Sequence, residues 1–372
     1  MKLEQFTIGS PKNSPTHCFG PLKAVTLDFA RDRGVTALVG ESGTGKSTAL
    51  EALAVLFRDL MAGKPAPAFA YTLTYRAGET RLRIDADPDR EDPYRIAAAP
   101  ASEDGPAEGT PLALAHFLDA GGAFLPRRLI GYSSGTNPRP RDVFEPGRFE
   151  GAPDDAASDS ERQKRAVLGA LRHAAEGGNL VLLDGPDSHL YPRDCATLSD
   201  RLAAFAGESI AGRAPSHIVF ATHQPITVAS LLKEQVQILR RTPGARRIDA
   251  ARPIINPRGM GFAGVLTSEV FDHASCLDRP TQQDVATLHR LSARTELDEA
   301  EQSQLRALRH RLEGLGFNFA SADPLEQDYL RARFDLAEDV PPDSPLLAPE
   351  NRRKALAALV RILLVGAQAG ST

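Results

Sequence analysis

Residues 40–48 of the chain read Gly40-Glu41-Ser42-Gly43-Thr44-Gly45-Lys46-Ser47-Thr48 and fit the pattern G-x-x-x-x-G-K-[ST]. The apolar run Val35–Val39 precedes them and predicts a buried strand, and residues 49–57 predict a helix. A glycine-rich loop between a strand and a helix can wrap backbone N–H groups around a polyphosphate. The N-terminus of the helix adds its positive dipole end. This stretch therefore predicts a P-loop that binds a nucleotide.

Two side chains of this loop would contact the nucleotide or its metal ion. Lys46 would reach the β- and γ-phosphates, and the hydroxyl of Ser47 would ligate Mg²⁺. The alternative is a glycine-rich turn ahead of a helix, but a chance match to the pattern is rare in 372 residues. We therefore expect ATP and Mg²⁺ as ligands, with residues 40–48 lining the nucleotide.

Composition excludes several classes of protein. The 42% hydrophobic content supports a sizeable core, and a formal net charge of −4 calls for neither nucleic acid nor an anionic membrane as partner. The three cysteines lie far apart and predict neither a disulfide framework nor a zinc site. No apolar signal core opens the chain, and residues 355–367 are too short to span a bilayer. The chain is predicted to be cytoplasmic.

The pattern of apolar residues divides the chain into an α/β region, residues 1–256, and a mostly helical region, residues 257–372. The second region would cap the first, oligomerise or dock a partner. Residues 69–85 predict a β-hairpin, and polar, Pro- and Gly-rich stretches predict mobile surface loops over about 86–110 and 136–157. Further strands are predicted at 3–8, 24–29, 128–132, 180–183, 218–221 and 236–239, and helices at 112–119, 160–175, 281–292, 297–312, 325–335 and 351–367. A capping box is predicted from Thr295 to Asp298.

Two polar residues follow the most apolar strands. Asp184 comes directly after residues 180–183, where a carboxylate could hold the Mg²⁺ shell of a P-loop protein; the alternative is an ordinary strand end. His223 follows residues 218–221, where it could donate a hydrogen bond to a γ-phosphate or an attacking water. A lone histidine can equally be structural.

These motifs, in this order, resemble ABC-type ATPases of the branch with RecF, SMC and OLD-type proteins. That branch commonly carries Leu-Leu-Asp-Glu-Pro-Glu followed by His-Leu-His-Pro, and then Thr-His-Ser-Pro. The matching segments here are Leu182-Leu183-Asp184-Gly185-Pro186-Asp187-Ser188-His189-Leu190-Tyr191-Pro192 and Ala221-Thr222-His223-Gln224-Pro225. Residues 128–137 are similar to a segment of AAA family ATPases in prokaryotic anti-phage and restriction-linked systems. The resemblance covers about residues 1–250.

The resemblance implies an α/β P-loop NTPase fold of ABC-ATPase type, with a mixed core sheet and an antiparallel β-subdomain. It also implies a head-to-head dimer or higher homo-oligomer, with nucleotides sandwiched between the P-loop of one subunit and a signature motif of the other. Residues 157–165 occupy the signature position in degenerate form. Ser158 and Ser160 would contact a γ-phosphate there; the alternative is a plain serine N-cap.

The sequence departs from the family pattern at two places. Gly185 occupies the position of the catalytic glutamate, which leaves His223 and Asp187 as catalytic candidates. No Gln occurs between the P-loop and the helix near Ser160, so Ser134 or Asn137 would have to replace the usual Mg²⁺-ligating Gln. We therefore predict tight ATP binding with slow or absent hydrolysis. The alternative is that Gly185 replaces the glutamate of an active parent.

Two functions remain open at this stage. The first is an ATP-binding scaffold or sensor in a prokaryotic antiviral defence system, controlling a separate effector such as a nuclease. The alternative is a RecF-like DNA-repair ATPase that clamps DNA on ATP-dependent dimerisation, although its basic residues can also be read as a solvated surface. The basic residues that would contact DNA are Arg127, Arg128, Arg139, Arg141, Arg240, Arg241, Arg246, Arg247, Arg352, Arg353 and Lys354.

Overall fold

The computed structural model divides the chain into two compact units, Met1–Ala274 and Ser275–Thr372. Residues 257–274, grouped with the helical region from sequence, fall in the first unit. The structure describes residues 1–101, 109–120, 122–134, 159–174, 177–207, 215–242, 247–273, 275–294, 297–317 and 358. Within these residues no helix is both long and apolar enough to cross a membrane.

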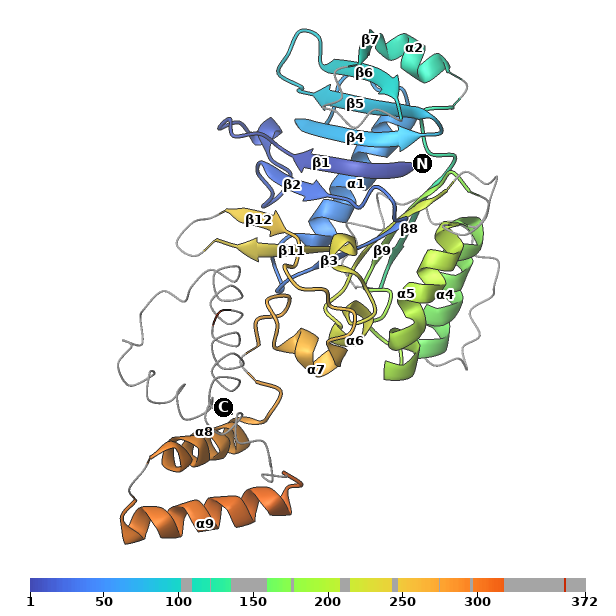
Figure 1. Cartoon of the computed structure of the whole chain (residues 1–372). Helices are drawn as coiled ribbons and strands as arrows, with labels where there is room; N and C mark the ends of the chain where they lie inside the picture. Colours follow the sequence, from blue (N-terminus) through green and yellow to red (C-terminus); the bar gives the residue numbers. More distant parts are fainter. Residues whose placement is uncertain are drawn as a thin grey trace, which may run out of the picture. The chain divides into compact units, whose positions relative to one another are not determined.

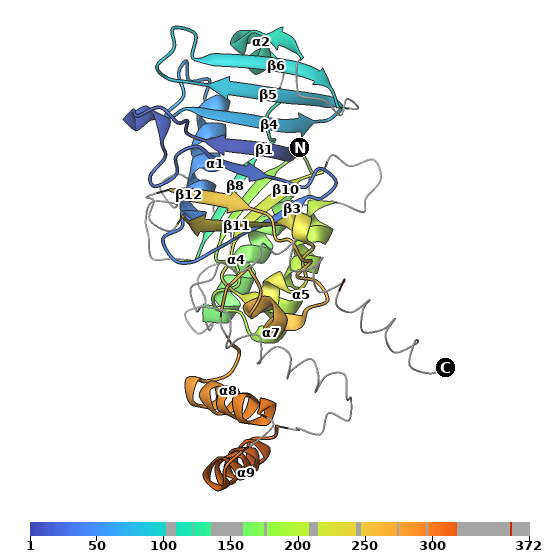
Figure 2. The same cartoon turned by 60° about the vertical axis from the view of Figure 1, so that its left-hand side comes forward.

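The first unit contains two six-stranded sheets (Figure 1). One is antiparallel, with the order β2-β1-β4-β5-β6-β7, and Figure 2 shows its strands β1, β4, β5 and β6 side by side. The predicted hairpin is confirmed in this sheet as β4 and β5, with Ala77 opposite Thr80 at the turn. The strand bounds are β1 Lys2–Ile8, β2 Val25–Asp28, β4 Tyr71–Ala77, β5 Thr80–Ala86, β6 Tyr94–Pro100 and β7 Thr110–Leu112.

The second sheet has the order β12-β11-β3-β10-β9-β8, and all its pairs are parallel except β11 with β12. Its central strands are the apolar runs of the sequence, because a parallel sheet is covered on both faces. Alternate residues confirm this: Leu38 belongs to one hydrophobic core, and its neighbours Ala37 and Val39 belong to the other. The strand bounds are β3 Val35–Val39, β8 Leu129–Ser133, β9 Leu180–Asp184, β10 His217–Ala221, β11 Val236–Arg241 and β12 Ile248–Ala251.

Helices cover the two faces of the parallel sheet. Helix α1 packs between this sheet and the antiparallel one (Figure 1). The ring of Phe57 in α1 meets that of Tyr75 in β4 edge to face, with 5.8 Å between ring centroids. Val167 of α4 and Leu198 of α5 pack in the core on the other face. The helices of this unit are α1 Lys46–Met61, α2 Leu114–Asp119, α4 Asp159–Ala174, α5 Pro192–Ala206, α6 Pro225–Val228 and α7 Gly261–Leu266.

The predicted surface loop over residues 86–110 is wrong in part, because β6 occupies Tyr94–Pro100. This strand pairs with β5, placing Ile96 opposite Ile84, and both side chains are buried. Alanines dominate its second half and have low strand propensity. The strand therefore depends on pairing with β5, which its own composition does not reveal. The loop predicted over 136–157 lies outside the described residues.

The second unit contains α8 Arg279–Ala293 and α9 Glu299–Gly314, which confirms the two helices predicted here. A small core joins them through Leu288, Leu291, Leu308 and Leu312. The capping box of α9 lies three residues later than predicted, from Asp298 to Glu301. Asp298 is the N-cap and accepts a hydrogen bond from the backbone of Glu301, whose carboxylate accepts one from the backbone of Asp298. The helices predicted at 325–335 and 351–367 lie outside the described residues.

A fully buried histidine joins the two sheets of the first unit. His217 Nδ1 accepts a hydrogen bond from the backbone of Leu3 in β1 at 3.1 Å, so its Nε2 carries the proton toward Thr36 Oγ1 at 3.3 Å. The ring also meets Phe29 edge to face. Burial, with smaller contributions from the N-terminal amine and Lys2, lowers the pKa of His217 to about 3. The imidazole is therefore neutral in the folded protein.

This histidine predicts a loss of stability in acid. Because unfolded His217 binds a proton below about pH 6.5 and the folded form does not, lowering the pH favours the unfolded state. The free energy of unfolding should fall by up to about 5 kcal/mol between pH 6.5 and pH 3 from this residue alone. Urea unfolding across that range, compared between the native chain and His217→Gln, measures it. The variant should show a shallower pH dependence, and equal slopes would contradict the assignment.

Candidate functional site

The glycine-rich loop predicted from sequence connects β3 to α1, and its glycines have the backbone conformations such a loop requires. Gly40 has φ +151° and Gly45 has φ +87°. A Cβ at Gly40 would lie 2.3 Å from the carbonyl oxygen of Leu239, and one at Gly45 would lie 2.7 Å from the side chain of Leu22. Side chains at either position are therefore excluded by both conformation and space. The loop passes close to β11 on one side and to the β1–β2 connection on the other.

The lysine of the loop folds back over the loop itself. Lys46 Nζ donates hydrogen bonds to the carbonyl oxygens of Gly40, at 2.8 Å, and Glu41, at 2.9 Å. Burial lowers the pKa of Lys46, and the carboxylate of Asp184 partly opposes this. The tip of the loop, residues 41–43, is exposed. A phosphate entering the loop would meet a positioned ammonium group, and ionic hydrogen bonds are stronger than those to neutral carbonyls.

Three parallel strands end at the same level and bring the predicted metal ligands together. In the sheet, Asp184 of β9 lies opposite Ala221 of β10, which lies opposite Leu38 of β3. Burial raises the pKa of Asp184, and a hydrogen bond from Ser47 and the charges of Lys46 and His223 act in the other direction. Ser47 and Asp184, the two predicted Mg²⁺ ligands, are therefore neighbours. Both offer oxygen atoms, the donors that Mg²⁺ prefers.

The loop after β10 carries His223 beside this cluster. Thr222 donates its backbone N–H to Leu38 at 3.0 Å, which fixes the loop to the end of β3. The hydroxyl of Thr222 in turn accepts a hydrogen bond from the backbone of Gln224 at 2.9 Å. His223 between them is exposed. The histidine is thus presented to solvent on a well-anchored turn, close enough to Asp184 to lower its pKa.

Gly185 lies at the centre of a tight turn after β9. Its φ is +61°, and a Cβ there would lie 2.4 Å from Ser134 Oγ and 2.5 Å from Ser188 Oγ. Its carbonyl oxygen accepts hydrogen bonds from Gln163 Nε2 at 2.8 Å and from Ser188 Oγ at 3.0 Å. The same Gln163 accepts from the backbone of His189 at 2.7 Å. The turn is therefore clamped to α4, a function of Gln163 that sequence reasoning missed.

Asp187 is buried, and its carboxylate contacts the segment that follows β10. Its Oδ2 accepts hydrogen bonds from the hydroxyls of Thr222 and Thr227, each at 2.6 Å. Its Oδ1 is buried without a partner among the described residues. Burial raises the pKa of Asp187, and the two hydroxyls partly offset this. These contacts join the turn after β9 to the loop that carries His223.

The structure describes only some of the remaining predicted site residues. Ser134 lies beside Gly185, as its contact with the position of a Cβ shows. Asn137 and Ser158 lie outside the described residues. Ser160 is described only as part of the backbone of α4.

No family model and no curated protein matches the chain. Among solved structures, the chain is similar to one titled as an SMC head bound to the C-winged helix domain of ScpA, with 13% sequence identity and a TM-score of 0.42. That similarity covers 68% of this chain and 98% of the other. At this score it carries no functional argument.

The turn at Gly185 predicts a measurable cost of adding a methyl group. Gly185→Ala should lower stability by about 1–2 kcal/mol for the left-handed backbone and by about 1–3 kcal/mol more for the contacts with Ser134 and Ser188. Gly207→Ala is the matched control, because Gly207 has φ +76° with nothing within 4 Å of its Cβ position. Thermal or urea unfolding compares the two. Equal losses would show that the turn relaxes freely.

Proposed function

We propose that this chain is a nucleotide-binding ATPase of ABC type that holds ATP and Mg²⁺ between residues 40–48 and the ends of β9 and β10. The observation that carries the proposal is the meeting of Lys46, Ser47, Asp184 and His223 at one edge of a parallel sheet. In this arrangement Lys46 contacts the β- and γ-phosphates, and Ser47 and Asp184 hold the Mg²⁺ shell. His223 contacts the γ-phosphate or the attacking water.

We further propose that hydrolysis is slow. Gly185 provides no carboxylate at the position after Asp184, and the loss of a positioned general base costs about 10²–10⁴-fold in rate. Asp187, the next carboxylate after Gly185, has its Oδ2 engaged by Thr222 and Thr227. Its contacts support a role in positioning the His223 loop. The bound nucleotide would then persist long enough to hold an assembly together.

The exposed tip of the loop supports a shared nucleotide site. Residues 41–43 face solvent, so a second subunit could cover the nucleotide. With the resemblance set out above, this supports a head-to-head dimer or higher homo-oligomer in which Ser158 and Ser160 complete the partner's site. The resemblance also supports a scaffold or sensor in antiviral defence that controls a separate effector such as a nuclease. The helical second unit would dock that effector or a further copy.

The alternative is a RecF-like clamp on DNA. Arg240 and Arg241, at the end of β11, favour it most, because Arg241 Nη2 lies 3.4 Å from the carbonyl oxygen of Gly43 at the loop tip. Basic groups at such a place could contact phosphates of DNA held between two subunits. An ATP-dependent mobility shift of duplex DNA that weakens steeply with salt would favour the clamp over the scaffold.

The site predicts that the loss of ATP affinity depends on Mg²⁺ in one variant and not in another. Lys46→Ala should weaken ATP binding about 10–100-fold with or without Mg²⁺, because it removes a charged hydrogen-bond donor. Asp184→Asn should weaken binding only when Mg²⁺ is present, because without the ion its carboxylate only repels the phosphates. Titration calorimetry with ATP, with and without Mg²⁺, measures both effects.

The control for these variants is Lys64→Ala, which removes an ion pair with Asp59 just beyond the other end of α1. It should bind ATP as the native chain does. Unchanged affinity in Lys46→Ala would contradict the proposed site.

The slow-hydrolysis proposal predicts how turnover can be raised. Gly185→Glu alone should destabilise the turn, because its Cβ meets two serine hydroxyls. Combined with Ser134→Ala and Ser188→Ala, which remove those hydroxyls, it should raise phosphate release by about 10-fold or more. The Ser134→Ala, Ser188→Ala double variant is the matched control and should stay slow. Fast turnover by the native chain that Lys46→Ala abolishes would overturn the proposal.

A further inference from the structure

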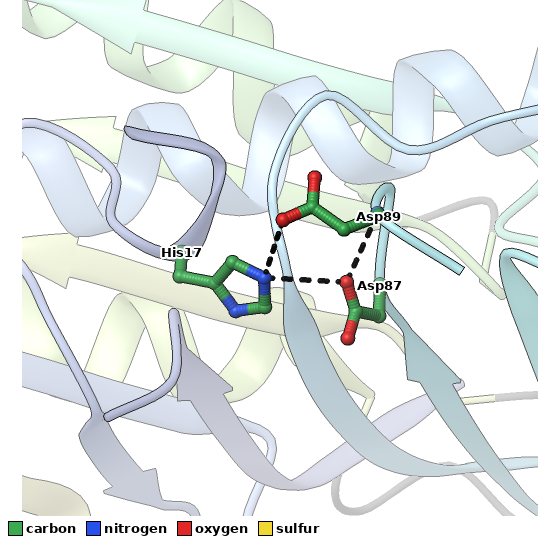
Figure 3. Close-up of side chains that lie close together, drawn as sticks. All are labelled: His17, Asp87 and Asp89. Carbon is green, nitrogen blue, oxygen red and sulfur yellow. Dashed lines mark hydrogen bonds and ion pairs between the residues drawn. The ribbon is translucent and has the colours of Figure 1, made fainter. Parts of the chain in front are cut away.

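A second cluster of ligand-type side chains, His17, Asp87 and Asp89, lies in connections between strands of the antiparallel sheet (Figure 3). His17 ends a short 3-10 turn between β1 and β2, and Asp87 and Asp89 follow β5. His17 Nε2 lies 3.1 Å from Asp89 Oδ2 and 3.3 Å from Asp87 Oδ1. One nitrogen and two oxygen atoms, from segments about seventy residues apart in sequence, thus converge within 4.8 Å of one another.

A hydrogen bond to Ser10 fixes the orientation of the His17 ring. Its side chain is 1% exposed, and its other ring nitrogen, Nδ1, lies 2.6 Å from Ser10 Oγ. When Nδ1 donates to that hydroxyl, Nε2 presents its lone pair to the two carboxylates. Metal-bound histidines almost always donate their second ring N–H to an oxygen acceptor, which fixes the tautomer. Ser10 lies outside the three-residue cluster and supplies that contact.

The distances from Nε2 to the two carboxylates and the exposure of Asp89 also fit an ion. Ligands bonded to a tetrahedral ion at about 2.0–2.1 Å lie about 3.3 Å from each other. The distances from His17 Nε2 to Asp89 Oδ2, 3.1 Å, and to Asp87 Oδ1, 3.3 Å, match this spacing. The side chain of Asp89 is 45% exposed, so an ion can enter from its side. The site therefore has a buried nitrogen at its base and an open carboxylate at its mouth.

We propose that His17, Asp87 and Asp89 bind a divalent transition-metal ion of the Zn²⁺ type, with water completing its coordination. An imidazole nitrogen with two carboxylates suits Zn²⁺ and its neighbours, whereas Mg²⁺ and Ca²⁺ prefer oxygen donors alone. This site is independent of the Mg²⁺ proposed at Ser47 and Asp184, and it does not rest on nucleotide binding.

The ion would tie two connections together next to the P-loop. His17 lies in the β1–β2 connection, residues 9–24, and the same connection reaches the loop: Leu22 packs against Gly45, and Gly20 against Thr48. The two aspartates lie in the β5–β6 connection. An ion bound by both connections would fix the β1–β2 connection at His17. Residues 20–22 of that connection would stay packed on the start of α1. The site is therefore structural in kind.

One neighbouring cation gives the proposal its sharpest test. Lys12 Nζ lies 3.0 Å from Asp87 Oδ2 and competes with an ion for that carboxylate. Its side chain is 64% exposed and free to leave. If the cluster is only a network of ion pairs, Lys12→Ala removes a stabilising partner and creates no binding. If it is a metal site, Lys12→Ala should tighten Zn²⁺ binding about 3- to 10-fold, because it removes a positive charge near the ion.

The experiment is titration calorimetry with Zn²⁺ on the whole chain after treatment with a chelator. Cys18, beside His17 in sequence, and the exposed Cys276 are in no disulfide and their thiols could bind Zn²⁺, so all variants are made on a Cys18→Ser, Cys276→Ser background. We expect one ion per chain. Ser10→Ala should weaken binding about 10–100-fold while leaving all three ligands in place. Asp89→Asn and His17→Gln should abolish it.

Two controls keep the result interpretable. His116→Gln alters an exposed histidine on α2 and should leave Zn²⁺ binding unchanged. Because His17 is buried, circular dichroism must show that His17→Gln is folded; Asp89→Asn, at the exposed edge, tests the ligand set if it is not. Zn²⁺ should also raise the melting temperature of the Cys18→Ser, Cys276→Ser chain, and it should not do so once Asp89→Asn is added. Absence of binding in the Cys18→Ser, Cys276→Ser chain, or unchanged binding in Asp89→Asn, would overturn the proposal.

Discussion

Parallel pairing of β10 with both β3 and β9 is the interaction on which the rest of the site depends. It sets Leu38, Ala221 and Asp184 at one level, so that the chain leaves all three strands at the same edge. Each exit then carries a different chemical group: a glycine-rich loop after β3, a carboxylate at the end of β9 and a histidine after β10. A shift of one residue in either pairing would turn these side chains to the other face of the sheet. The apolar strands fix the register because both faces are buried in hydrophobic cores.

Buried polar groups beneath this edge of the sheet hold the segments after β9 and β10 in place, and burying them is unfavourable in free energy. Asp187 is buried with one oxygen bonded to Thr222 and Thr227 and the other without a described partner. Burying a carboxylate in this way is unfavourable unless its contacts are strong. Both hydroxyls belong to the segment around His223, so the contacts link the end of β9 to the segment after β10. A buried carboxylate of this kind fixes the position of the two segments relative to each other and adds little to the free energy of unfolding.

The parts of the fold and site that sequence could predict are those encoded locally. Residues 40–48 identify a loop between a strand and a helix, and the apolar runs before Asp184 and His223 place those residues at strand ends. Strand β6 was missed because its alanines depend on pairing with β5. The clamp made by Gln163 and the cluster around His17 were missed for a similar reason. Their partners lie far away in sequence, and no local pattern marks such contacts.

Gly185 is the residue at which the sequence and the structure bear most directly on each other. From sequence it is the absence of a glutamate, and that absence is equally consistent with a simple replacement in an active parent. In the structure the left-handed backbone, the two serine hydroxyls beside the Cβ position and the hydrogen bonds to its carbonyl oxygen all fit a glycine. Ser134 and Ser188 fill the space that a side chain would need, and Gln163 holds the carbonyl oxygen of the turn. The surroundings of Gly185 therefore fit a glycine at this position, which agrees with the proposal that hydrolysis is slow.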